Sequence, residues 1–370
     1  MSSAVSIIAL IVILGLVIFI HEFGHYLLAK RNGVGVVEFS IGVGPDIFSW
    51  TRNETKYAVK WIPFGGYCMM LGEDNYFPDP SLDSEAPEID ETRAFSRKPV
   101  WVRIAIIFAG PVFNFLLALV LAVILTALIG ASTTRIGGVT PGYPAAEAGL
   151  QAGDEITRLD GKRMHLFSDV SLYIALHEGE ALDVTFKRDG ETHESTIVPV
   201  YDEEAGRYYI GITSAQRKTD LNALEILKYG YYEFAYDTGV VFKSLGMLFT
   251  GKAGLNDLSG PVGMAGMVDE IVTEVADDTK NESFWTTAYW VIINLLSFTV
   301  LISANLGIMN LLPIPAVDGG RLIFLFLEAV RGKPVEKKWE GIVTVAGFIL
   351  LAVLMVVVLF NDIRKVFFAG

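Results

Sequence analysis

The chain has 370 residues, of which 52% are hydrophobic and 19% charged, a composition typical of an integral membrane protein with a water-facing part. Its formal net charge of −13 comes from 42 acidic and 29 basic residues, and the sequence has no dense block of Lys and Arg, which argues against a nucleic-acid partner. The single cysteine, Cys68, excludes an intramolecular disulfide and a metal site built from several thiolates.

Four hydrophobic segments are long enough to cross a lipid bilayer as helices, because a hydrocarbon core requires about 20 helical residues. They cover residues 4–29, 100–130, 288 to about 312, and 341 to about 360. The bilayer is therefore an expected partner of the chain.

The first segment carries a polar motif at residues 21–25, His-Glu-Phe-Gly-His, in a stretch with no other charged residue. His21 and His25 fall on one face of a helix, so both imidazoles can reach one metal ion, and Glu22 beside them is a candidate base. Ionisable groups at membrane depth are costly and usually functional. The motif predicts a zinc site within the membrane.

Residues 39–70, between the first two segments, are expected to form short strands with a polar turn at 50–55. They end in Gly65, Gly66 and Tyr67, where the glycines lack side chains and allow another backbone to approach.

Two soluble parts follow. Residues 73–93, acidic and with three prolines, are expected to be a flexible cytosolic linker. Residues 133–215 have the composition of a small α+β domain that is suited to binding peptides. Its expected elements are strands at 136–139, 154–159, 182–186 and 195–200, a helix at 167–177, and turns at Asp160-Gly161 and Asp189-Gly190.

Residues 221–245 are rich in aromatic side chains. Such rings favour the headgroup region, which predicts an amphipathic helix on the outer membrane surface. A helix in a domain core is nearly as good an interpretation of the same pattern.

The distribution of basic residues predicts the orientation. Those that flank the first loop are Lys30, Arg31, Arg97 and Lys98, and those in the loop before the fourth segment are Arg321, Arg331, Lys333, Lys337 and Lys338. Because loops rich in Lys and Arg stay in the cytosol, both loops are expected there, with both termini and the α+β domain outside the cytoplasm. His21 would then lie ~13 Å from the cytosolic end of its helix, in the inner half of the membrane.

A third metal ligand is expected where the third hydrophobic segment is broken. Catalytic zinc commonly has three protein ligands and one open position. Two prolines and two glycines within residues 310–320 interrupt a helix around Asp318, which is our candidate third ligand; a helix-capping role remains open from the local sequence. Asn310, eight residues earlier, could stabilise an oxyanion, and Glu22 could transfer the proton of an attacking water.

The motif at 21–25 together with residues 310–319 resembles the site-2 protease family of intramembrane zinc metalloproteases. Other motifs resemble its bacterial members with one PDZ domain: Gly65-Gly66-Tyr67, residues 95–101, Ala109-Gly110-Pro111 with Asn114, residues 144–154, and Ser259-Gly260-Pro261-Val262-Gly263. Val317 departs from the leucine that the family commonly has there, an apolar exchange that barely affects the assignment of Asp318.

The resemblance implies a multi-pass protein of the bacterial plasma membrane that cleaves single-span membrane proteins after a first protease has removed their outer part. Anti-sigma factors and signal-peptide remnants are examples of such substrates. It also implies that residues 65–67 lie on a membrane-embedded strand that extends the substrate, and that the PDZ domain helps to admit trimmed substrates.

The expected fold is therefore a multi-span α-helical membrane protein with four transmembrane helices, a membrane-associated β-sheet or hairpin, and an inserted α+β PDZ-like domain. Its expected parts are residues 1–130, 131–215, 216–287 (an amphipathic interfacial segment) and 288–370. Two other classes are compatible with polar groups at membrane depth. A transporter would require repeated broken helices, and a PDZ scaffold with structural zinc would require a fourth ligand.

Overall fold

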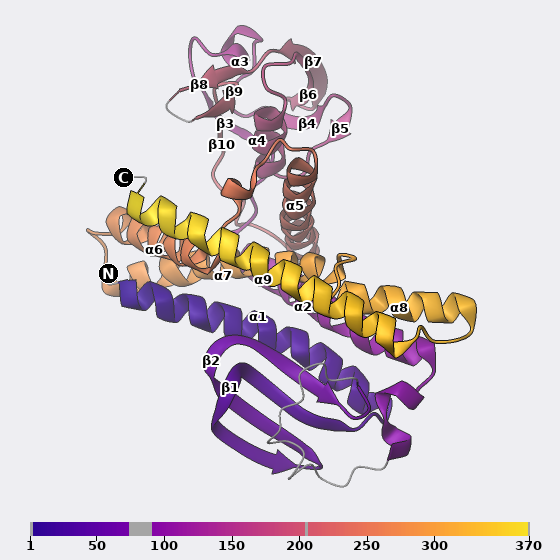
Figure 1. The fold of residues 1–370 in the computed structure, drawn as a ribbon. Helices are drawn as coiled ribbons and strands as arrows, with labels where there is room; N and C mark the ends of the chain where they lie inside the picture. The colour runs from indigo at the N-terminus through magenta and orange to yellow at the C-terminus, as the bar shows by residue number, and fades with distance from the viewer. Residues whose placement is uncertain (1–2, 74–90, 204–205, 369–370) are drawn as a thin grey trace. The chain divides into compact units, whose positions relative to one another are not determined.

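The computed structural model describes residues 3–73, 91–203 and 206–368 (Figure 1). By its backbone contacts the chain forms two compact units, one with the residues up to 118 and from 240 onward, the other with residues 119–239. Residues 74–90, most of the predicted cytosolic linker, lie outside the described part of the chain.

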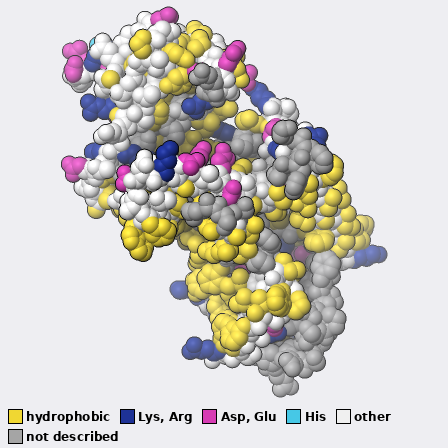
Figure 2. Space-filling view, turned by 90° about the vertical axis from the view of Figure 1, so that its left-hand side faces the viewer, with side chains coloured by type: hydrophobic (Ala, Val, Ile, Leu, Met, Phe, Trp, Pro, Cys, Tyr) yellow, Lys and Arg dark blue, Asp and Glu magenta, His cyan; other side chains and the backbone are white. Residues whose placement is uncertain are grey.

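Four of the described helices are long and apolar enough to span a membrane, as predicted. They are α1 (Ser3–Arg31), α2 (Val100–Ile129), α7 (Phe284–Leu311) and α9 (Lys337–Phe368). Large hydrophobic side chains remain exposed along them, for example Ile8 of α1 and Leu350 of α9, and Figure 2 shows broad hydrophobic areas on the face that it displays. Surfaces of this extent are those that lipid covers.

The segment between α1 and α2 is one long antiparallel hairpin of β1 (Val36–Arg52) and β2 (Thr55–Met70). The expectation of short strands is wrong, since the strands have 17 and 16 residues. Glycines at positive φ, including Gly42 (+86°) and Gly65 (+98°), let irregular pairing bend the hairpin without ending it. The predicted polar turn is present, with Asn53 and Glu54 at φ 46° and 66°.

The first unit has two buried cores. One packs α1, the hairpin, α2 and α8 (Asp318–Arg331) through residues such as Ala29, Phe39, Ile107 and Leu322. The other packs α1, α6 (Pro261–Asp278) and α7 through Ile13, Val268, Val272 and Phe298. Short 3-10 turns lie at Glu91–Arg93, Phe95–Arg97 and Leu255–Asp257.

The second unit contains the α+β domain. Its sheets have the strand orders β5-β4-β6-β7, β10-β3 and β8-β9, and its core is built from residues such as Ile156, Leu159, Ile174 and Val184. The elements are β3 (Ile136–Val139), α3 (Pro144–Glu147), β4 (Glu155–Leu159), β5 (Lys162–Arg163), α4 (Phe167–Leu176), β6 (Leu182–Arg188), β7 (Glu191–Ile197), β8 (Val200–Asp202), β9 (Arg207–Tyr209) and β10 (Ile212–Ser214). The first and last residues of the domain lie side by side, because Ala131 and Lys218 exchange backbone hydrogen bonds of 3.0 and 2.9 Å.

The segment predicted as interfacial contains two helices with different surroundings. The aromatic stretch forms α5 (Ala223–Phe249), whose Gly230 lies against the backbone of Val123 in α2. Helix α6 instead contributes to a core, with Val268 and Val272 fully buried. Its start is fixed by Asp362 of α9, whose carboxylate accepts hydrogen bonds from the backbone N–H groups of Gly260 and Gly263.

Candidate metal centre

The two histidines of α1 lie one turn apart on the same face of the helix. Their ring centroids are 4.8 Å apart, the rings are nearly perpendicular, and both side chains are buried. Each ring presents its Nε2 atom to the same point, since the two Nε2 atoms are 3.3 Å apart.

Asp318 reaches the histidines because the chain turns sharply after α7. Helix α7 ends at Leu311, and Ala316 adopts φ +80° before α8 begins at Asp318. Pro313 and Pro315 cannot continue a helix. Gly319 is required by this turn, because a Cβ there would lie 2.0 Å from the carbonyl oxygen of Leu312.

The three side chains fit a zinc ion. Asp318 Oδ2 lies 3.1 Å from His21 Nε2 and 3.3 Å from His25 Nε2. Ligand atoms held ~2.0–2.1 Å from a tetrahedral zinc are themselves about 3.3 Å apart, so the three separations suit one ion. Asp318 Oδ2 is also a buried oxygen to which no described group donates a hydrogen bond, as expected of an atom whose partner is a cation.

Close packing of α1 against α2 holds the histidine rings. The Nδ1–H of His25 donates a 2.9 Å hydrogen bond to the carbonyl oxygen of Ile106, which leaves its Nε2 free as a ligand. A Cβ on Gly24 would lie 2.5 Å from Ala109 O, and one on Gly110 would lie 2.3 Å from His25 Nε2. The two helices therefore approach closely only because these positions are glycines.

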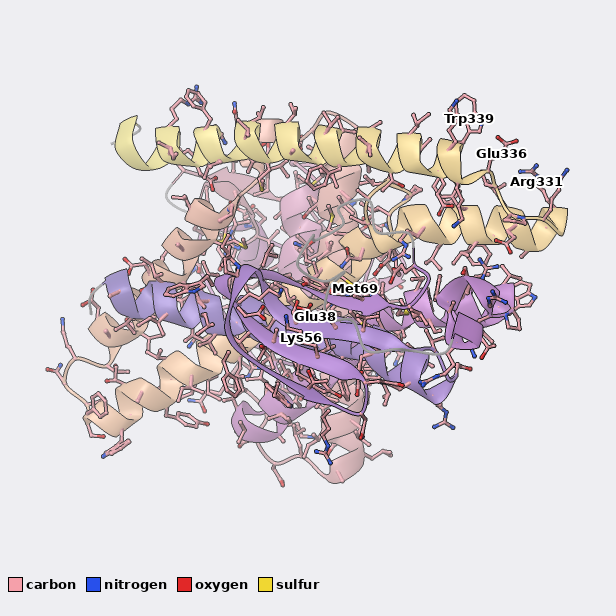
Figure 3. All side chains as sticks on the ribbon, turned by 60° about the horizontal axis from the view of Figure 1, so that its bottom comes forward. Glu38, Lys56, Met69, Arg331, Glu336 and Trp339 are labelled. Atoms are coloured by element: carbon pink, nitrogen blue, oxygen red, sulfur yellow. The ribbon has the colours of Figure 1, made fainter. Side chains whose placement is uncertain are left out.

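Glu22 lies with His25 and Asp318 on the wall of a cavity of about 1090 Å³. The hairpin contributes one side of the cavity, for example Val43 and Tyr67, and helices α8 and α9 contribute another. Figure 3 shows the hairpin with Glu38, Lys56 and Met69, and the connection from α8 to α9 with Arg331, Glu336 and Trp339.

The predicted substrate element runs beside the candidate base. A Cβ on Gly66 would lie 3.4 Å from Glu22 Cγ and 2.9 Å from Ser40 O, so β2 lies directly on α1 at the level of the motif. The Tyr67 hydroxyl donates a 2.9 Å hydrogen bond to Glu38, whose carboxylate pairs with Lys60 at 2.9 Å. Burial disfavours charge on Lys60, but the contacts with Tyr67 and Glu38 raise its pKa above the ordinary value.

Asn310 lies half-buried in the last turn of α7. It is absent from the set of described residues that line the cavity, so its proposed contact with a reacting carbonyl remains a prediction.

Gly110 and Asn114 lie next to the histidine rings. From the sequence they are named only as part of a motif, and no role in the site is predicted for them. A lone asparagine within an apolar helix was the available signal, because polar groups at membrane depth usually have a function.

These features define a membrane protein with a buried His-His-Asp site beside a carboxylate. The match to peptidase family M50, the site-2 protease family, extends over residues 9–354, and the chain belongs to this family. It is a zinc metalloprotease, which excludes the transporter and scaffold interpretations.

Relatives match along nearly their whole length. The regulator of sigma-W protease RasP of Bacillus subtilis is 33% identical over an alignment of 433 positions, which covers 98% of this chain and 99% of the relative. The zinc metalloprotease RasP of Geobacillus kaustophilus is 34% identical over an alignment of 433 positions, with 98% of each chain covered. Among solved structures, the PDZ domain of an SdrC-like protein from Listeria monocytogenes aligns with a TM-score of 0.21 and 25% identity over 23% of this chain and 90% of that domain.

Proposed function

We propose that this protease hydrolyses peptide bonds within or next to the transmembrane segment of single-span membrane proteins, after another protease has removed their outer part. The observation that carries this proposal is the position of the candidate ligands. His21 and His25 lie inside α1, of which residues 4–31 are apolar enough to span a membrane. A peptide bond that reaches them must enter the bilayer.

His21, His25 and Asp318 would hold the zinc ion through two nitrogen atoms and one oxygen. The support is their mutual separations of 3.1–3.3 Å and the buried Asp318 oxygen that accepts no hydrogen bond from the described residues. A zinc ion held there would act as a Lewis acid toward water and toward the peptide carbonyl.

Glu22 is the proposed general base. It takes a proton from the attacking water as the new C–O bond forms, and it then passes this proton to the nitrogen of the leaving amine as the C–N bond breaks. Its support is its place on the cavity wall beside His25. Asn310 is the proposed donor to the oxyanion that develops on the peptide carbonyl.

Residues 65–67 are the proposed site at which the substrate unwinds. A transmembrane helix hides its peptide groups in internal hydrogen bonds, and a protease must offer replacement partners. Strand β2 can offer them by pairing with an extended segment. The support for this site is the close approach of β2 to the candidate base, since a Cβ on Gly66 would lie 3.4 Å from Glu22 Cγ and Gly65 and Tyr67 are its neighbours in the strand.

The proposed setting is the bacterial plasma membrane, with both termini and the α+β domain outside the cytoplasm. The name of the Bacillus subtilis relative, regulator of sigma-W protease RasP, links that protein to a sigma factor. An anti-sigma factor or a signal-peptide remnant is the substrate class that we propose for this chain. The domain boundaries at 130, 215 and 287 belong to the same proposal.

The test uses the purified full chain in detergent with a model transmembrane peptide. Wild-type protein is expected to cleave the peptide, to lose this activity with a chelator, and to regain it with zinc. Glu22→Gln is expected to keep zinc and lose cleavage, because the base is removed while the ligands remain. Substantial turnover by folded, zinc-loaded Glu22→Gln protein would contradict the assignment of the base, and chelator-resistant cleavage would contradict the metal site.

A further inference from the structure

The second ring nitrogen of His21 faces a side chain whose role the proposed reaction leaves unexplained. Asn114 Nδ2 of α2 lies 3.3 Å from His21 Nδ1. Asn114 is fully buried in a helix that is otherwise apolar around it, and nothing among the described residues hydrogen-bonds to its Oδ1 atom. A buried amide oxygen that accepts no hydrogen bond is costly, so a donor is expected at this place.

The position of this amide is fixed from a second helix. The Ser303 hydroxyl of α7 donates a 2.8 Å hydrogen bond to the backbone carbonyl of Asn114, and both residues have 0% exposure. A Cβ on Gly307, one turn further along α7, would lie 3.3 Å from Pro111 O. The backbone that carries the amide is therefore held between α1 and α7.

The two histidines are held by partners of different kinds. His25 Nδ1 faces the carbonyl oxygen of Ile106, which only accepts hydrogen bonds, so His25 always presents Nε2 without a proton when it is neutral. His21 Nδ1 faces an amide, which can present either an NH2 donor or a carbonyl acceptor. The tautomer of His21 therefore decides which end of the Asn114 amide faces Nδ1.

Zinc binding decides the tautomer. If His21 Nε2 is a ligand, its Nδ1 carries a proton and becomes a donor. We infer that Asn114 is a positioning residue for the metal site: its Oδ1 accepts a hydrogen bond from His21 Nδ1–H and so holds the ring with Nε2 toward the metal position. This inference rests on the proposed function. It assigns Asn114 the task that the Ile106 carbonyl performs for His25, and it gives the buried Oδ1 a donor.

The test compares two substitutions of similar size in the full-length protein. Asn114→Leu removes the acceptor, and Asn114→Asp keeps it, since a carboxylate accepts a hydrogen bond from a zinc-bound histidine. Thr126→Val in the same helix is the control. Among the described residues the hydroxyl of Thr126 bonds only to Ala122 of its own helix, and Thr126 is buried like Asn114. Zinc affinity is measured by competition with a chromophoric chelator, and thermal stability is measured with and without zinc.

Asn114→Leu is expected to bind zinc about 10–100-fold more weakly, the usual cost of losing such a partner. Asn114→Asp should bind zinc at least as tightly as wild type, and Thr126→Val should match wild type. Equal affinity of Asn114→Leu and wild type would overturn the inference, as would an equal loss in both Asn114 variants. If Asn114→Leu does not fold, the inference is tested with Asn114→Asp alone. Zinc binding by Asn114→Asp that is weaker than that of wild type, or a smaller thermal stabilisation of this variant by zinc, would overturn the inference. A wild-type chain that binds no zinc would instead refute the proposed function.

Discussion

Replacement of Gly110 by alanine should destroy the metal site while leaving the helix intact. An added Cβ would lie 2.3 Å from His25 Nε2 and 2.8 Å from His21 Cε1. Ordinary contact begins at 3.4 Å, so the His25 ring must retreat by about 1.1 Å. Metal–ligand distances tolerate only about ±0.2 Å, and misplacement by about 1 Å typically costs 100-fold in function.

The ring cannot retreat freely, because its other nitrogen is bonded to Ile106 at 2.9 Å. We therefore expect Gly110→Ala to lower zinc affinity by about 100-fold or more, measured by chelator competition, with peptide cleavage lost in parallel. Gly15→Ala is the matched control: it lies in α1, a Cβ there would meet nothing within 4 Å, and alanine should stabilise that helix by up to about 1 kcal/mol. Wild-type zinc affinity in folded Gly110→Ala protein would refute this reasoning.

Three further outcomes are expected. Asp318→Ala should lower zinc occupancy together with activity, whereas Asn310→Ala should lower activity at normal zinc occupancy. Normal zinc occupancy in Asp318→Ala protein would exclude Asp318 as a ligand. In a variant without the native cysteine, Lys187→Cys should react with a membrane-impermeant thiol reagent in intact cells and Lys333→Cys only after permeabilisation, and the reverse pattern would invert the topology. Deleting residues 132–217 should preserve zinc binding and cleavage of a short transmembrane peptide while full-length substrates with bulky outer domains are cleaved more readily. Failure of a folded deletion variant on the short peptide would instead assign the domain to the catalytic machinery.

The elements set by strong local constraints could be predicted from the sequence. Membrane helices are recognisable because the hydrocarbon core demands long apolar runs, and the predicted 100–130 compares with Val100–Ile129 in the structure. The histidine pair follows from helical periodicity alone. The turn predicted at Asp189-Gly190 is present in the α+β domain, because these two residues readily adopt positive φ between two alternating strands.

The parts that depend on contacts between distant segments could not be predicted. Residues 39–70 were expected to form short strands, whereas Gly42 and Gly65 supply bends within continuous pairing of two long strands. The role of Gly110 depends on how closely α2 approaches α1, and that of Asn114 on the ring nitrogen it faces. Neither distance is encoded in the composition of one segment.

The pairing of Ala131 with Lys218 has a consequence for biosynthesis. These residues are separated by 87 positions, from 131 to 218, yet their backbones bond to each other, and β3 pairs with β10 in the same way. Contacts between positions so far apart form late, because a long loop must close before they are made. The domain can therefore close only after residue 218 has left the ribosome, and on the predicted topology after it has crossed the membrane. Until then its unpaired strands require protection from aggregation on the outer side.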